Sequence, residues 1–183
     1  MLAGAPTEQV RAVVERVSAV LKDPRLKAET QARERRDRLR KILYSGFDFS
    51  EMARRSLGSQ WRRLSPQEQE EFVQLFTDLL ERAYIDKIES YRNETVRYPK
   101  EKLDGNFAEV ESRIVGQKGE EYTLLYKLQL AGGEWKVYDV VIENISLVNN
   151  YRSQFSRIIA GSSYQELLRR LKTKQVNLAK ESK

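Results

Sequence analysis

Apolar residues recur every three to four positions through much of the chain, which is the spacing of amphipathic helices. In the first such stretch, over residues 7–22, the apolar positions are Val10, Val13, Val14, Val17 and Leu21. The pair Asp23-Pro24 ends this stretch. The same period predicts helices over residues 26–44, 51–57, 66–91 and 150–159, and a last helix after Ser163.

Two local signals mark where predicted helices begin. Ser65-Pro66-Gln67-Glu68 has the spacing of a capping box, with proline at the first helical position. Ser163-Tyr164-Gln165-Glu166 repeats that spacing before the last helix. Gly46 and Gly58 follow two other apolar stretches and are expected to end those helices, because glycine tolerates the backbone of a helix C-terminus.

Between residues 95 and 147 the period of the apolar positions changes to two, which predicts strands. Tyr122, Leu124, Tyr126, Leu128 and Leu130 show the alternation most clearly. We expect strands over residues 95–98, 107–115, 122–130 and 135–147, the first ending before Pro99. Gly132-Gly133 is typical of a tight hairpin turn. The short connections favour an antiparallel meander.

These elements predict an α+β fold, in which an antiparallel sheet of about four strands packs against several helices. We expect a single domain over residues 1–183, helical over 1–91, a sheet over 95–147 and helical again over 150–180. Many large aromatic residues fall on the apolar faces. They form an ordinary core or, collectively, line an apolar pocket between the sheet and the helices.

The charge is unevenly distributed. The 183 residues include 33 Lys or Arg and 27 Asp or Glu, for a formal net charge of +6. Residues 1–46 carry +5 and residues 163–183 carry +4, whereas the middle carries −3. The basic run from Arg33 to Lys41 is interrupted by Glu34 and Asp37. We interpret it first as a solvated helix face and keep a nucleic-acid or anionic-surface binding module as an alternative.

Little catalytic chemistry is available. The chain has no Cys and no His, which excludes thiolate nucleophiles, zinc sites built on those residues, and imidazole bases. No glycine-rich phosphate-binding loop is present. Asp139 and Glu143 lie four residues apart on the same face of one predicted strand, and a small enzyme that uses them as acid and base is a second alternative. We interpret them first as an ion-pair partner and a solvated residue, and expect neither enzyme activity nor a metal.

Two segments resemble the MlaC-type, or toluene-tolerance, family. Phe47 to Trp61 reads Phe-Asp-Phe-x-x-Met-x-x-x-x-Leu-Gly-x-x-Trp, and Ser146 to Phe155 reads Ser-Leu-Val-x-Asn-Tyr-Arg-Ser-Gln-Phe. These patterns lie in residues 47–84 and 135–159, and the likeness covers the chain from the first helix to the last, in the same order. Members of that family are periplasmic phospholipid-binding proteins of the Mla intermembrane lipid-transport system, a pathway of outer-membrane lipid asymmetry in Gram-negative bacteria.

The resemblance implies an NTF2-like fold whose apolar cavity holds phospholipid acyl chains and leaves the head group near solvent. It implies a soluble periplasmic carrier that shuttles lipids between the outer and inner membranes, with phospholipid as ligand and no cofactor. The implied partners are an inner-membrane ABC transporter complex with an MCE-domain subunit and an outer-membrane lipoprotein–porin complex, with no nucleic acid. We expect a monomer without a transmembrane segment, and we expect no signal peptide within Met1 to Val10.

The resemblance and the period-two face of the sheet together give candidate site residues. The expected lipid-lining residues are Phe49, Met52, Leu57, Trp61, Phe72, Phe76, Leu79, Tyr126, Leu128, Val140, Ile142, Tyr151, Phe155 and Ile159. Arg54, Arg55 and Arg152 are expected to contact the head group or a partner. The inward face of the last strand stays open, since Val137 and Val141 compete with Tyr138, Val140 and Ile142.

Overall fold

The computed structural model describes residues 4–176, which form two compact units, each assembled from separate parts of the chain. The sheet unit contains residues 4–48 and 87–144. The helical unit contains residues 49–86 and 145–176. The expectation of one domain over the whole chain stays a prediction.

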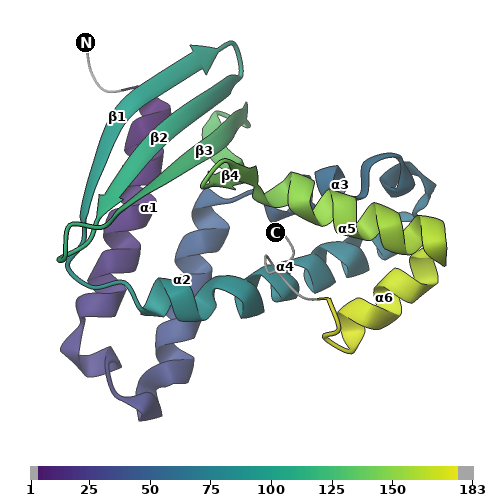
Figure 1. The fold of residues 1–183 in the computed structure, drawn as a ribbon, viewed down its shortest axis with the longest axis horizontal. Helices are drawn as coiled ribbons and strands as arrows, with labels where there is room; N and C mark the ends of the chain where they lie inside the picture. The colour runs from purple at the N-terminus through teal and green to yellow at the C-terminus, as the bar shows by residue number, and fades with distance from the viewer. Residues whose placement is uncertain (1–3, 177–183) are drawn as a thin grey trace. The chain divides into compact units, whose positions relative to one another are not determined.

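In the sheet unit, antiparallel strands lie side by side with a helix along one face (Figure 1). Its elements are α1 (Ala5–Lys22), the 3-10 turns η1 (Pro24–Leu26) and η2 (Glu29–Gln31), α2 (Ala32–Gly46), β1 (Thr95–Asp104), β2 (Phe107–Val115), β3 (Glu121–Ala131) and β4 (Glu134–Ile142). The strand order is β1-β2-β3-β4-β5, where β5 is the two-residue strand Ile145–Ser146, whose residues are counted with the helical unit. The α+β prediction is confirmed, with five strands where about four were expected.

A β-bulge determines which residues of β4 face the core of the sheet unit. Leu128 pairs with Val137 while Lys127 pairs with Asp139, so Tyr138 is an extra residue in β4. The bulge interrupts the alternation and places Val137 on the same face as Val140. That face packs against Val10 of α1, and its buried members are Ala108, Val110, Leu128, Val137 and Val140.

The structure corrects two predicted elements near Pro24 and Pro99. Residues 26–31 do not begin a long helix, because the backbone carbonyls of Leu26 and Ala28 accept hydrogen bonds from the Arg35 side chain. The first strand does not stop before Pro99 but continues to Asp104. Proline is tolerated there because β1 is an edge strand, and the register with β2 shifts between Arg97 and Lys100.

The predicted strand over residues 135–147 is wrong in its second half. Glu143 and Asn144 have φ angles of 49° and 68°, so the chain turns in the left-handed region after Ile142. A short β5 follows, and the Ser146 hydroxyl accepts a hydrogen bond from the Asn149 backbone N–H at 3.1 Å. This cap starts the next helix at Leu147, three residues earlier than the apolar period predicted.

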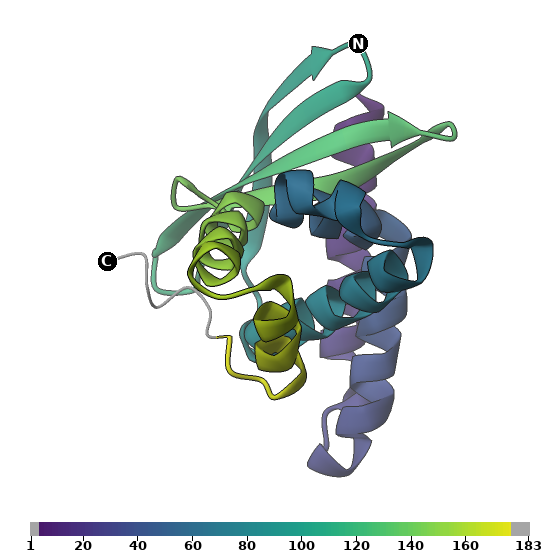
Figure 2. The same ribbon diagram turned by 90° about the vertical axis from the view of Figure 1, so that its right-hand side faces the viewer.

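In the helical unit, helices surround a common apolar core (Figure 2). They are α3 (Phe49–Leu57), the 3-10 segment η3 (Gly58–Arg63), α4 (Pro66–Glu89, its last turn belonging to the sheet unit), α5 (Leu147–Gly161) and α6 (Tyr164–Lys172). The capping box at α4 is confirmed: Ser65 Oγ accepts from Glu68 N–H at 3.1 Å, and Glu68 Oε1 accepts from Ser65 N–H at 2.9 Å. Ser163 caps α6 through the N–H of Glu166 at 3.0 Å.

Gly58 at the end of α3 is required by its backbone and by its neighbour. Its φ is +58°, and a Cβ there would lie 3.1 Å from Nη2 of Arg152. We expect Gly58→Ala to lower the free energy of unfolding by about 1–2 kcal/mol, the cost of a left-handed non-glycine residue. Gly161→Ala is the matched control, because Gly161 has no positive φ and open space around it. Equal urea midpoints for the two variants would contradict this role for Gly58.

Candidate functional site

The ten expected lining residues outside the sheet all lie in or against the core of the helical unit. Seven are buried with 0–6% of their surface exposed: Met52, Leu57, Phe72, Phe76, Leu79, Tyr151 and Phe155. Phe49, Trp61 and Ile159 are half-buried and pack against the others. The two segments that carry the family resemblance therefore converge on one apolar centre.

Aromatic rings dominate that centre. Phe76 meets Tyr151 edge-on at 5.7 Å between ring centroids and meets Phe155 edge-on at 6.1 Å. Phe72 stacks on Phe76 at 6.1 Å and meets Phe155 edge-on at 5.9 Å. Burial, together with the neighbouring Tyr84, raises the pKa of Tyr151 above the usual range for tyrosine. The centre is apolar, and the Tyr151 phenol within it stays neutral near pH 7.

The four expected lining residues of the sheet share one face. The register pairs Leu124 with Ile142, Tyr126 with Val140 and Leu128 with Val137, all on the side that packs against α1. Leu128 and Val140 are buried, whereas Tyr126 and Ile142 are half-buried. Burial raises the pKa of Tyr126 to about 12, so its phenol is also neutral. Leu125 pairs with Val141 on the opposite face.

A small pocket lies between α1 and β1 in the sheet unit, with a volume of about 170 Å³. Its lining residues are Arg11, Val14, Glu15, Ser18, Tyr91, Glu94, Val96 and Tyr98. The Arg11 guanidinium lies 4.8 Å from the centre of the Tyr98 ring, which is a cation–π contact. Burial raises the pKa of Tyr91 to about 12. The sequence pattern placed Tyr91 and Tyr98 on apolar faces but did not predict that they line the same pocket.

The three arginines expected to contact the head group or a partner differ in whether they form ion pairs within the described structure. Arg54 and Arg55 both bind Glu51, with Nε–Oε2 and Nε–Oε1 distances of 2.9 and 2.8 Å. Burial raises the pKa of Glu51, but these hydrogen bonds outweigh it and the net shift is downward. Arg152 is exposed on α5 and lies against Gly58. Of the three, Arg152 is the one with no hydrogen bond or ion pair to residues 4–176.

The proposed acid–base pair is not assembled. Asp139 is 5% exposed in β4, and its Oδ1 accepts the backbone N–H of Val140 at 2.9 Å. Glu143 lies beyond the end of β4, in the left-handed turn. The expectation that both carboxylates share one strand face is therefore wrong. The paired arrangement on which the enzyme alternative depended is not present.

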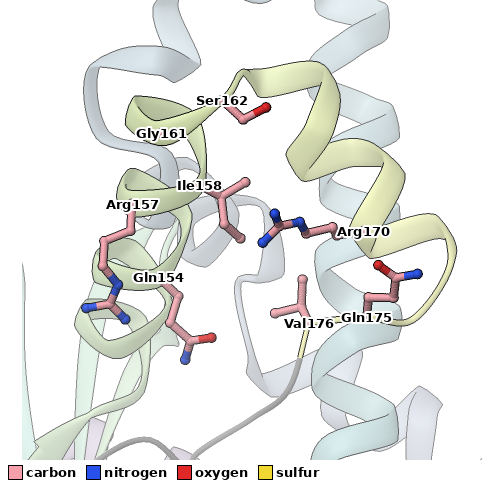
Figure 3. Close-up of a pocket in the computed structure, with 8 residues that line it drawn as sticks. All are labelled: Gln154, Arg157, Ile158, Gly161, Ser162, Arg170, Gln175 and Val176. Carbon is pink, nitrogen blue, oxygen red and sulfur yellow. The ribbon is translucent and has the colours of Figure 1, made fainter.

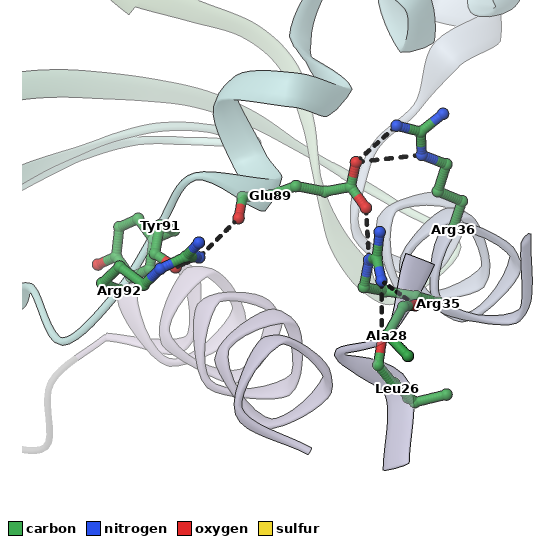
Figure 4. Close-up of polar contacts among 7 residues, drawn as sticks. All are labelled: Leu26, Ala28, Arg35, Arg36, Glu89, Tyr91 and Arg92. Atoms are coloured by element: carbon green, nitrogen blue, oxygen red, sulfur yellow. Dashed lines mark hydrogen bonds and ion pairs between the residues drawn. The ribbon is translucent and has the colours of Figure 1, made fainter. Parts of the chain in front are cut away.

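Four arginines of the Arg-rich run of α2 form ion pairs within the sheet unit, and Figure 4 shows the two that bind Glu89. Arg35 and Arg36 both bind the Glu89 carboxylate, at 2.5 Å and 2.8 Å. Arg38 binds Glu34, and Arg40 binds Asp37. Cations that are already paired release fewer counterions from nucleic acid, which disfavours the basic-module alternative.

No group of three or more Asp or Glu side chains that could hold a metal ion occurs among residues 4–176. Within the same range, no helix combines the length and the apolar character needed to cross a membrane.

Comparison with known proteins gives one consistent family. The chain matches the family model described as MlaC protein over residues 11–173. The intermembrane phospholipid transport system binding protein MlaC of Haemophilus influenzae is 32% identical over 99 residues, which are 51% of this chain and 46% of that protein. The toluene tolerance protein ttg2D of Pseudomonas putida is 30% identical over 96 residues, which are 52% of this chain and 45% of that protein.

These curated matches span about half the length of the relatives. A solved structure extends the likeness over nearly the whole chain. It is the phospholipid-binding protein from Ralstonia solanacearum in complex with a phospholipid, and it is 26% identical with a TM-score of 0.81. The match covers 93% of this chain and 96% of that one. Because the family model matches most of its residues, this chain belongs to the MlaC protein family.

Proposed function

We propose that this protein is a periplasmic carrier that binds a phospholipid by its acyl chains and moves it between the two membranes of the cell envelope. The observation that carries the proposal is the match along 93% of the chain to a protein whose structure holds a phospholipid. The residues we assign to the acyl chains are the half-buried apolar residues next to the core of the sheet unit, among them Leu124, Tyr126 and Ile142.

The physical need for such a carrier follows from the hydrophobic effect. Two acyl chains with about 30 methylene groups cost about 24 kcal/mol to expose to water, at about 0.8 kcal/mol each. A lipid that crosses an aqueous space therefore needs an apolar environment for the whole journey. Binding of this kind uses apolar contact and little polar chemistry, which agrees with a chain that lacks His and Cys.

The partners of the carrier belong to the same proposal. A chain without a nucleotide-binding motif must take the direction of transport from other proteins. We assign that role to an inner-membrane ABC transporter complex with an MCE-domain subunit and to an outer-membrane lipoprotein–porin complex. The exposed Arg152 is the most available of the candidate docking residues.

Native mass spectrometry followed by lipid extraction tests the carrier function directly. We expect the purified protein to carry a mass excess equal to one or two phospholipids, or to acquire it from liposomes. Protein that keeps its bare mass after incubation with liposomes would overturn the proposal.

The two faces of the sheet offer a matched test of where the acyl chains lie. Leu124 and Ile142 are paired on the inner face, and Leu125 and Val141 are paired one residue away on the outer face, all half-buried. We expect Leu124→Gln or Ile142→Gln to weaken phospholipid binding about tenfold, because each removes apolar contact worth about 1.5 kcal/mol.

Leu125→Gln and Val141→Gln are the controls and are expected to leave phospholipid binding unchanged. Occupancy is measured by native mass spectrometry after equilibration with a limiting amount of liposomes. Circular dichroism confirms that each variant is folded. Equal losses for the inner and outer pairs would contradict the assignment of the inner face.

A further inference from the structure

A second pocket lies wholly within the helical unit, between α5, α6 and the turn that follows α6 (Figure 3). Its volume of about 380 Å³ lies within the range of small-molecule sites, about 300–1,000 Å³. None of the aromatic residues Phe72, Phe76 and Phe155 lines it, although Ile158 and Val176 belong to the same apolar core. Neither the sequence patterns nor the family resemblance pointed to this place.

The backbone after α6 builds one wall of the pocket. Lys174 has a φ of 60°. The N–H of Gln175 donates to the carbonyl of Arg170 at 2.8 Å, and the N–H of Lys174 donates to the carbonyl of Leu171 at 3.3 Å. This pair of bonds is a Schellman motif, which reverses the chain at a helix C-terminus. The reversal brings Gln175 and Val176 back to face α5.

The polar groups that line the pocket are mainly hydrogen-bond donors. The Arg170 side chain reaches from α6 toward α5 (Figure 3), and its Nε donates to Glu166 at 3.0 Å. The Gln175 Oε1 accepts from Arg169 at 3.4 Å, and its NH₂ group makes no hydrogen bond with residues 4–176. Ser162 adds a hydroxyl group.

Two further donors come from α5. Gln154 is 7% exposed, and its contact with Asn150 is long at 3.5 Å, so a buried amide is available at the pocket. Arg157 is exposed and makes no hydrogen bond or ion pair with residues 4–176, so its guanidinium is able to turn toward a ligand.

Among residues 4–176, no carboxylate lines the pocket. The nearby Glu166 is already held by Arg169 and Arg170, whose hydrogen bonds lower its pKa to about 2. Ile158 and Val176 supply the apolar part of the lining. The site therefore combines two guanidinium groups, neutral donors and a small apolar surface.

We infer that this pocket binds a phosphate group, supplied by a phospholipid head group or by free phosphate. Guanidinium groups bind phosphate through paired, charge-assisted hydrogen bonds, and the amide and hydroxyl donors complete the set around its oxygen atoms. The inference goes beyond acyl-chain carriage and does not depend on it, because it rests on the hydrogen-bond donors of this pocket and not on apolar contacts.

The test follows the backbone amide signals of Ser162 and Gln175 by NMR during titration with sodium phosphate at constant ionic strength. We expect saturable shifts in the wild-type protein and about tenfold weaker binding in Arg157→Gln. Arg157 contacts no described residue through a hydrogen bond, so this variant is expected to fold normally. Arg170→Gln is the second variant, with the same expected loss.

Lys172→Gln is the matched control, because it removes one positive charge from α6 without touching the pocket lining. We expect it to bind phosphate as the wild type does. Equal weakening in Lys172→Gln and Arg157→Gln would show a general charge effect and would overturn the inference. Absence of saturable shifts in the wild type would overturn it as well.

A second arm distinguishes the two sources of phosphate. The same amide signals are compared before and after loading with phosphatidylglycerol from vesicles, with loading verified by lipid extraction. If loading shifts these signals and added phosphate then causes no further shift, the ligand is the lipid head group. Unshifted signals in loaded protein that still respond to phosphate identify free phosphate. If the protein takes up no phosphatidylglycerol, that result contradicts the carrier proposal and leaves the phosphate titration as the test of this inference.

Discussion

Replacing Phe76 by alanine is expected to lower the free energy of unfolding of the helical unit by about 3–5 kcal/mol. The Phe76 side chain is 0% exposed, and its ring contacts the rings of Phe72, Tyr151 and Phe155. Truncation removes the transfer free energy of the ring and leaves a cavity whose lining loses its dispersion contacts. Because these neighbours come from α4 and α5, the loss affects both helices.

The measurement is urea denaturation followed by tryptophan fluorescence in a Trp135→Phe background. The chain has two tryptophans, so this background leaves Trp61, which belongs to the helical unit, as the only reporter. Leu75→Ala is the control on the same helix, since Leu75 is only half-buried and is expected to cost less. A Phe76→Ala midpoint equal to that of Leu75→Ala would contradict the central role of this ring.

The same burial changes how lipid binding should be probed. A charged residue at position 76 or 79 would be placed in a core where the native side chains are 0% exposed. An uncompensated buried charge is far more costly than lost apolar contact. We therefore expect Phe76→Asp and Leu79→Glu to unfold the helical unit, which makes half-buried residues such as Ile142 the better probes of a ligand.

Short sequence signals correctly predicted several elements of the fold. The Ser65–Glu68 capping box, the Gly132–Gly133 hairpin and the strand over residues 107–115 were all identified from a few neighbouring residues. The capping box and the hairpin turn depend on hydrogen bonds or backbone angles within about four positions, and the strand was marked by its alternating apolar residues. The apolar faces of the helices were also predictable, because burial follows the helical period.

Features that depend on distant partners could not be predicted in this way. The bulge at Tyr138 breaks the period-two pattern without any proline or glycine to mark it. The left-handed turn at Glu143 and Asn144 interrupts an apolar run that reads as one strand. For the site, apolar residue types are the same in a core and in a lipid cavity, so the sequence identified the residues and not their packing.

Glu89 is the clearest case of a residue with an unexpected role. It lies in the last turn of α4, and its carboxylate binds Arg35 at 2.5 Å and Arg36 at 2.8 Å (Figure 4). Arg35 also donates to the carbonyl of Leu26 at 2.7 Å, so one arginine joins α2, α4 and the preceding turn. Nothing in the sequence spacing marks this contact, since Glu89 is more than 50 residues from its partners.

We expect Glu89→Gln to lower the free energy of unfolding by about 2 kcal/mol near neutral pH. The side chains of Glu89 and Arg35 are 14% and 12% exposed, so the substitution leaves a largely buried guanidinium without its counter-charge. Glu34→Gln is the control, because Glu34 and Arg38 form an exposed pair on α2 worth less than about 1 kcal/mol.

The pH dependence provides a second, independent signature of the Glu89 contact. Burial raises the pKa of Glu89, but hydrogen bonds from Arg36 and Arg35 outweigh it and hold the pKa below its ordinary value of 4.5. The contribution is therefore fully present above pH 4.5 and is lost as the pH falls through the lowered pKa. We expect the difference between wild type and Glu89→Gln in urea denaturation to be constant near neutral pH and to shrink in acid. A difference that persists unchanged in acid would mean that the loss comes from packing and not from the ion pair.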